Sequence, residues 1–253
     1  TTSIEQSSID GLSANITGVD NAEQAAVNIS ARAIMANNID SSVGGLDNAN
    51  AQGINGAFQL SGLERSISAD AIDVAGISGN NFAAEDISAS GFAANHSGDA
   101  FSANVQSASV SSFQSDATRL NSAELNDLSL SGTQSKQQLE LGSANLSGLA
   151  HNKVAVDSAS LQQLSAGANV DPENLSTSNF DASVSALVAT GISSELGGGR
   201  RINAGEISAS NLNLGQSGAP NTKNVQLSGD QLSVSNFDGQ SNHGSARASG
   251  VNM

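Results

Sequence analysis

Few residues in the sequence combine the type and the spacing that chemistry requires. The three histidines, His96, His151 and His243, lie far apart, so no two of them have the spacing of a metal-binding pair on one element. The sequence also contains no Gly-x-Ser-x-Gly motif, no phosphate-binding P-loop and no EF-hand loop. We therefore predict a protein that is not an enzyme and that has no catalytic residue and no cofactor.

One basic, glycine-rich segment is the best candidate for an interaction loop. It consists of Gly197, Gly198, Gly199, Arg200 and Arg201. Glycines leave backbone amides accessible, and two neighbouring guanidinium groups could bind a carboxylate or a phosphate. The simpler interpretation, which we favour, is a flexible corner with two solvated arginines.

Two further features could take part in binding. Glu85 and Asp86, with the scattered acids of the first half, could bind calcium weakly. Surface charge that favours solubility explains these acids more simply. His151 occupies a repeat position that we expect to point inward, where a hydrogen-bonded histidine is expected rather than a ligand. The sequence assigns no metal site and leaves calcium dependence open.

Composition restricts the elements that could hold these residues. The chain of 253 residues has no cysteine, tryptophan or tyrosine, so its core must be narrow and filled by smaller apolar side chains. The absence of cysteine excludes disulfides and thiolate sites. The longest apolar runs are too short to span a membrane.

The acidic charge indicates what kind of partner the chain could bind. The formal net charge is −15, and residues 1–117 carry 13 acidic and two basic residues, whereas residues 118–253 carry 11 and seven. Free nucleic acid and anionic membranes would be repelled. We expect a protein partner, either a basic protein or a second copy that associates end to end.

A five-residue repeat is the main feature of the sequence. From Ile4 the chain divides into IEQSS, IDGLS, ANITG and VDNAE, in which position one is apolar. Along the chain, position three is usually small or apolar. An amphipathic helix would need a period of 3.6 residues and a strand would need a period of two. Steps of two and then three predict a short extended segment followed by a corner.

The unit ANLSG at 144–148 matches the consensus of pentapeptide-repeat proteins, and most of the chain resembles this family. The resemblance implies an all-β fold, a right-handed parallel β-solenoid of about 12 coils with four repeats in each. Another type of parallel β-helix is the alternative. The repeat positions predicted to line the core are Ile29, Ile34, Ile72, Ile77, Phe82, Ile87, Phe92, Leu125, Leu128, Leu146 and Leu161.

The repeat predicts one continuous solenoid over residues 1–253, with small breaks. These breaks lie near 63–66, 97–102, 169–174, 197–201 and 217–224, and both prolines, Pro172 and Pro220, fall within them. Proline cannot donate to a sheet ladder, so it suits such a break. Repeats begin and stop without capping units, so we expect the chain to be a segment of a longer protein.

We expect a non-catalytic structural or interaction module of a larger bacterial protein that is exported, acts as an effector or lies at the cell surface. Its expected location is extracellular or on the cell surface. The family resemblance suggests an alternative, an acidic DNA mimic that binds a type II topoisomerase in the cytoplasm. A β-helical enzyme acting on polysaccharide is a third alternative, which the lack of tryptophan and tyrosine for sugar stacking disfavours.

Overall fold

A computed structural model describes residues 2–20, 25–62, 64–171, 176–197, 200–217, 224–241 and 244–252. These residues are almost entirely β-strand and contain no helix, which confirms the predicted all-β class. The strands are β1 (Thr2–Asp10), β2 (Ser13–Thr17), β3 (Ala26–Ser41), β4 (Gly44–Gln59), β5 (Glu64–Gly79), β6 (Phe82–Ser97), β7 (Ala100–Ser115), β8 (Thr118–Gly132), β9 (Lys136–His151), β10 (Val154–Asp171), β11 (Ser176–Gly197), β12 (Arg200–Ser217), β13 (Asn224–Ser228), β14 (Gln231–Ser241) and β15 (Gly244–Asn252).

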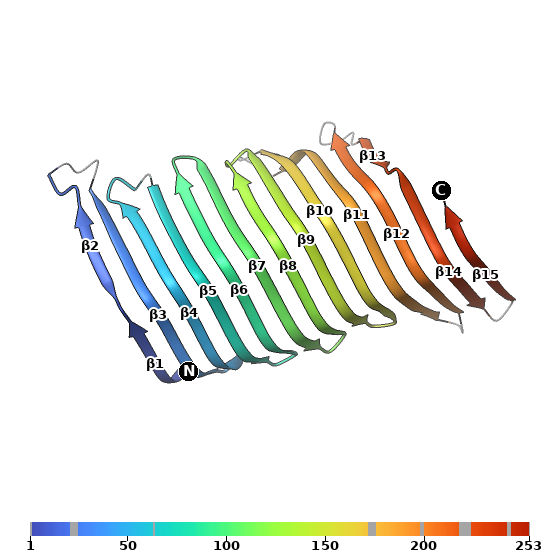
Figure 1. The fold of residues 1–253 in the computed structure, drawn as a ribbon, viewed down its shortest axis with the longest axis horizontal. Helices are drawn as coiled ribbons and strands as arrows, with labels where there is room; N and C mark the ends of the chain where they lie inside the picture. The colour runs from blue at the N-terminus through green and yellow to red at the C-terminus, as the bar shows by residue number, and fades with distance from the viewer. Residues whose placement is uncertain are drawn as a thin grey trace.

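All of these strands belong to one open sheet, in which each strand follows its predecessor along the chain (Figure 1). β1 and β2 pair with the same side of β3 and together form the first edge strand, while β13 and β14 pair with β12. Each described strand contacts only the strands with which it is hydrogen-bonded, so no second layer covers either face. The solvent-accessible surface is 15466 Å², whereas a compact protein of this mass should expose about 10,000 Å².

The structure confirms stacked β-repeats but not the predicted right-handed parallel solenoid. Every described strand pair is antiparallel, so neighbouring strands run in opposite directions and are not the parallel rungs of a coil. The physical reason is that about three five-residue units run together into one strand of 16 residues, as in β3 to β7. A five-residue period alone does not distinguish a corner from an irregularity within a longer strand.

The irregularity is a pair of rows in which the backbone ladder is interrupted. We call these the unpaired rows, because their residues are skipped in the register between neighbouring strands while the register on both sides stays the same. The first row comprises Glu5, Asn38, Asp47, Gly76, Glu85, Ser112, Asn121, Gly148, Asp157, Gly191, Gly205 and Asn236. The second comprises Gly11, Arg32, Gly53, Asp70, Gly91, Gln106, Asp127, Gly142, Gln163, Ser185, Asn211 and Asp230.

The unpaired rows follow a simple rule along and across the strands. Each strand from β3 to β12 contributes one unpaired residue with positive φ, such as Gly53 at 62° or Gly76 at 64°, and this residue comes six positions after the strand's other unpaired residue. Across each row, residues with positive φ alternate with residues that lack it. In each pair of neighbouring strands, a residue with positive φ therefore lies opposite a residue without it, and this holds in both unpaired rows.

The unpaired rows explain the five-residue period. A residue that takes no part in the ladder shifts the two-residue alternation of side chains by one, as in a β-bulge. In β5, Ile72 and Val74 lie between the two rows, and the next large apolar residue, Ile77, follows Gly76 after a step of three. The shift returns the apolar side chains on both sides of the row to the same face, which is what a repeat of two and three requires.

The predicted breaks near 63–66, 97–102, 197–201 and 217–224 lie at or next to connections between strands. The break near 63–66 adjoins the turn after Gln59, and the break at 97–102 contains the two-residue turn Gly98-Asp99. The breaks near 197–201 and 217–224 fall between β11 and β12 and between β12 and β13. Pro172 and Pro220 lie outside the described residues.

The residues predicted to line a closed core do not do so. None of the eleven is buried, and Ile29, Ile34, Phe82 and Ile87 are 40–46% exposed. The buried apolar residues of the described chain are six alanines and Leu141. A sheet with one layer can shield a side chain only by its neighbours on the same face, so alanine is covered where isoleucine is not.

Candidate interaction surfaces

The predicted glycine–arginine loop lies where the chain passes from β11 to its antiparallel neighbour β12. Gly197 ends β11 and Arg200 and Arg201 begin β12, while Gly198 and Gly199 lie outside the described residues. The guanidinium of Arg201 forms an ion pair of 3.2 Å with Glu195 across the turn, although both side chains are largely exposed. This partner on the same hairpin weakens the case for an anion site.

The candidate calcium ligands are engaged by serines of the next strand. Glu85 accepts a hydrogen bond of 2.7 Å from the hydroxyl of Ser112, and Asp86 accepts one of 3.5 Å from Ser111. Calcium needs six to eight oxygen ligands, and no group of three or more His, Asp or Glu side chains in the described part of the chain could hold a metal ion.

His151 is hydrogen-bonded, as predicted, but it is exposed at the end of β9 and does not point into a core. Its Nδ1 lies 2.7 Å from the hydroxyl of Thr118, and its Nε2 lies 2.8 Å from the amide nitrogen of Asn152. His96 lies opposite Phe101 near the end of β6, and His243 lies outside the described residues. Neither described histidine forms an ion pair with a carboxylate of the described residues.

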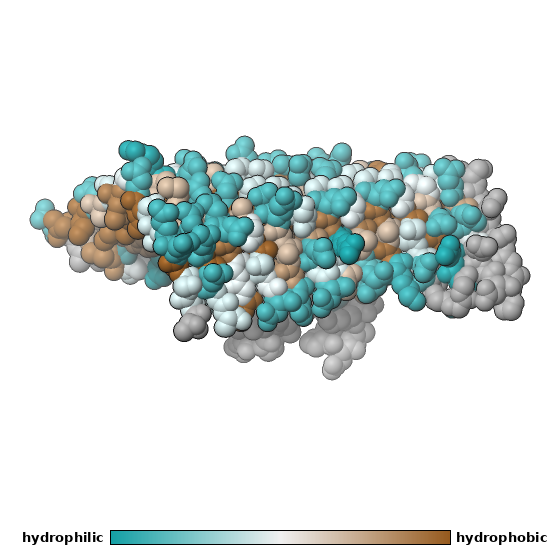
Figure 2. Space-filling view, turned by 90° about the horizontal axis from the view of Figure 1, so that it is seen from below, coloured by the Kyte–Doolittle hydropathy of each residue, from teal (hydrophilic) through white to brown (hydrophobic). Residues whose placement is uncertain are grey.

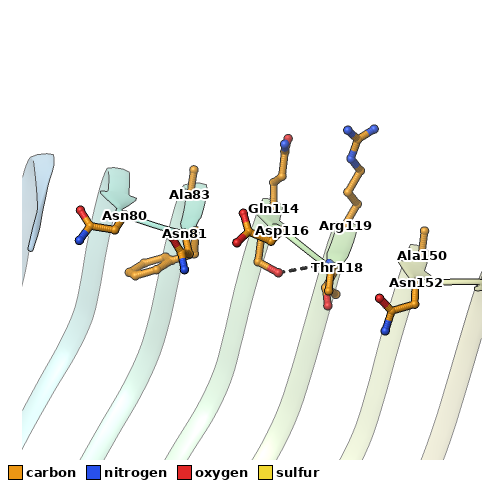
Figure 3. A pocket seen from close by; sticks show the side chains of 12 residues that line it. Asn80, Asn81, Ala83, Gln114, Asp116, Thr118, Arg119, Ala150 and Asn152 are labelled. Carbon is orange, nitrogen blue, oxygen red and sulfur yellow. Dashed lines mark hydrogen bonds between the residues drawn. The ribbon is translucent and has the colours of Figure 1, made fainter.

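A concavity lies over the turns that join β5 to β6, β7 to β8 and β9 to β10 (Figure 3). Its volume is about 480 Å³, and its polar lining includes Asn81, Asp116, Arg119 and Asn152. The amide nitrogen of Thr118 donates to the hydroxyl of Ser115 at 3.2 Å within it. The charged groups are one acid and one base at the ends of different strands, which is a polar surface and not an acid–base or nucleophilic arrangement.

One face of the sheet carries two continuous rows of apolar side chains between the unpaired rows, and we call these the apolar rows. Residues in each row lie directly opposite one another on neighbouring strands, with large and small side chains often paired, as in Ile72 with Ala89. One row comprises Ile34, Ala51, Ile72, Ala89, Ala108, Leu125, Ala144, Leu161 and Leu187; the other comprises Ala36, Ala49, Val74, Ile87, Val110, Ala123, Leu146, Ala159 and Ala189.

The opposite face, between the same unpaired rows, is a ladder of hydroxyl and amide groups. Hydroxyl oxygens of directly opposed residues lie 2.6–2.7 Å apart in Ser88–Ser109, Ser90–Ser107, Ser122–Ser147, Ser158–Thr190 and Ser208–Ser233. Asn48 donates to Asn37 at 2.6 Å in the same way. These groups satisfy one another in pairs, so the polar face needs no second layer, whereas the apolar rows remain uncovered.

Six residues of the apolar rows were among those predicted from the sequence to line a closed interior, and the unpaired rows were missed altogether. These six are Ile34, Ile72, Ile87, Leu125, Leu146 and Leu161. A spacing of six residues between an acid and a following Gly, as between Asp47 and Gly53 or Asp70 and Gly76, is a signal in the sequence for part of the unpaired rows. The described residues include no helix long and apolar enough to cross a membrane. Comparisons of the chain with protein-family models, with curated proteins and with solved structures found no match.

Proposed function

We propose that the chain is a non-catalytic structural and interaction module of a larger bacterial protein that is exported or lies at the cell surface. One observation carries this proposal: two rows of apolar side chains run across an extended sheet, and no element of the described chain covers them. Uncovered apolar area of this extent commonly marks a surface that another protein covers. The partner surface is therefore an apolar protein surface within the assembly that holds the module.

The two faces of one strand provide a matched test. Leu125 lies in an apolar row between Ala108 and Ala144, whereas its neighbour Glu124 lies on the polar face between Ser109 and Asn145. We expect the wild-type chain in the medium or the cell envelope when producing cells are fractionated and blotted with an antibody to this segment. Leu125→Ser should reduce the share retained in that fraction by about fivefold, because a buried leucine contributes about 1–2 kcal/mol to an interface.

Glu124→Ser is the control, and it should leave the retained share unchanged. Circular dichroism of both purified variants checks that the sheet is intact. Equal losses in the two variants would contradict an interaction through the apolar face. A wild-type band confined to the cytosol would contradict the exported module.

The DNA-mimic alternative depended on a rod of about the width of duplex DNA. A sheet with one layer does not offer that cross-section, so the structure adds no support to this alternative. Inhibition of gyrase supercoiling by the purified chain, in a salt-sensitive manner, is the measurement that would restore it.

A further inference from the structure

The first edge strand, formed by β1 and β2, carries a series of exposed apolar side chains. All residues from 2 to 20 are exposed, with exposed fractions of 54% for Ile4, 58% for Ile9 and 63% for Leu12. In Figure 2 the N-terminal end of the sheet, at the left, is correspondingly brown. No described strand pairs with the outer side of this edge, so a row of backbone donors and acceptors is open there.

This edge lacks the usual protection against pairing with another chain. Natural edges are blocked by lysine, by proline or by a covering element, but residues 2–17 include no lysine and no proline. The strand's acids are Glu5 and Asp10, and the charge of Asp10 is offset by an ion pair of 3.0 Å with Arg32 of β3. The edge is therefore competent to add a further strand.

The unpaired rows specify which strand would fit. In both unpaired rows, a residue with positive φ lies opposite a residue without it. Gly91 lies opposite Asp70 in this way, and Gly76 lies opposite Glu85. The first edge strand carries one residue of each kind: Glu5 in one row and Gly11, with φ of 64°, in the other. The two are six residues apart, as on every other strand that carries both.

We propose that the first edge strand pairs with the same strand of a second copy of this chain, antiparallel and about a two-fold axis. Rotation by 180° about the normal of the sheet places Glu5 of each copy opposite Gly11 of the other. In both unpaired rows, a residue with positive φ then lies opposite a residue without it. Residue numbers of opposed residues then add to 16, and Ser8 faces Ser8 on the axis. This proposal rests on the proposed interaction function and names one partner for it.

The side chains that this register brings together match those within the sheet. On the apolar face, Ser7 opposes Ile9 of the second copy, a small residue against a large one, as Ala89 opposes Ile72. Ile4 opposes Leu12 of the second copy, as Leu128 opposes Leu141. On the polar face, the two Ser8 hydroxyls repeat the Ser88–Ser109 contact of 2.7 Å.

The axis gives a direct test, because the chain contains no cysteine. In Ser8→Cys, the only two thiols of a dimer would be directly opposed, and opposed Cα atoms of an antiparallel pair are about 4.5–5.5 Å apart, within the range of a disulfide. Mild oxidation should convert most of this variant into a disulfide-linked dimer of twice 25.2 kDa. Ser160→Cys, at the equivalent position of the internal strand β10, is the matched control and should stay uncrosslinked.

A second variant tests the non-covalent dimer. Ser8→Lys places two ammonium groups opposite each other on the axis, and like charges in that position oppose pairing. Its dissociation constant, measured by sedimentation, should rise about threefold to tenfold. Ser160→Lys should have no such effect.

Three results would overturn the proposal: a wild-type chain that is monomeric at every concentration, an open-ended series of oligomers, or a dimer in which Ser8→Cys does not crosslink. An open-ended series would indicate head-to-tail addition, since only a two-fold interface closes at two copies. A dimer without the crosslink would indicate association through the apolar rows. The Leu125 test probes a different surface with a different measurement, so failure of the edge proposal and failure of the proposed function are distinguishable.

Discussion

The β4–β5 hairpin and the β6–β7 hairpin have the same backbone but fill their unpaired rows differently. In β4–β5 both residues with positive φ are glycines, Gly53 and Gly76, and the carboxylates of Asp70 and Asp47 occupy the space where a Cβ atom would lie. In β6–β7 one of the two is Ser112, with φ of 50°, and its hydroxyl donates to a carboxylate oxygen of Glu85 at 2.7 Å.

The difference shows that the sheet requires the left-handed backbone conformation at these positions but does not require one particular type of side chain there. A left-handed conformation costs an L-residue about 1–2 kcal/mol, and a hydrogen bond to a carboxylate at an exposed site returns about 1 kcal/mol of this. Glycine avoids the cost and leaves room for the opposite carboxylate. Each solution works only when the two opposed residues fit each other, so exchanging one residue alone should be destabilising.

The largest effect is expected where glycine lies against a carboxylate. Gly53→Val introduces a branched side chain at φ of 62° and directly into the space of Asp70. The expected loss is about 3 kcal/mol of local stability, which corresponds to an increase of about 100-fold in the opening constant of β4–β5. Hydrogen–deuterium exchange of peptides from this hairpin measures that constant.

Gly215→Val is the control for this prediction. Gly215 lies in β12 without positive φ, and nothing lies within 4 Å of an added Cβ atom. Exchange of the peptides that cover β12 should change by less than about threefold. A similar loss of protection in both variants would mean that valine weakens any strand of this sheet, and the unpaired row would then have no special requirement.

The all-β class and the apolar repeat positions could be predicted from sequence because both depend on local spacing. Ile72, Val74 and Ile77 share a face in a coil wall and in a bulged strand alike, so their spacing of two and three predicts the side-chain pattern without predicting the topology. The direction of neighbouring strands depends on the turns. Two-residue turns such as Asn80-Asn81 and Gly98-Asp99 occur 18 residues apart and would have indicated hairpins.

The candidate surfaces were predictable only in part, because exposure is a property of the whole sheet. Leu125 and Leu146 were identified as core-lining residues from their repeat positions, but whether a second layer covers them is not encoded in those positions. The edge strand was missed for a related reason. Ile4 and Ile9 look like any other apolar repeat residues, and only the order of strands in the sheet shows that they lie at an edge.

A smaller effect is expected at the hydrogen-bonded unpaired position. Ser112→Ala keeps the left-handed backbone and removes the donor to Glu85, so β6–β7 should lose about 1 kcal/mol, or about fivefold in its opening constant. Ser112→Gly also removes the donor but relieves the left-handed conformation. This variant should therefore lie within about 0.5 kcal/mol of the wild type.

The order of these two variants is the informative result. If Ser112→Gly were as destabilised as Ser112→Ala, the hydrogen bond to Glu85 would carry the whole effect, and the left-handed conformation would cost nothing at this position. The contrast between the two hairpins would then reflect hydrogen bonding alone.

The smallest expected effect lies in the ladder of the polar face, where the same hairpin carries the directly opposed Ser90 and Ser107. Their hydroxyl oxygens are 2.6 Å apart and part-buried. A double-mutant cycle with Ser90→Ala and Ser107→Ala should give a coupling energy of about 0.5 kcal/mol, because water on the open face can replace the lost partner in each single variant. A coupling energy above about 1.5 kcal/mol would indicate that water does not reach these hydroxyls. The polar face would then be covered in solution, and the polar face, not the apolar face, would be the interaction surface.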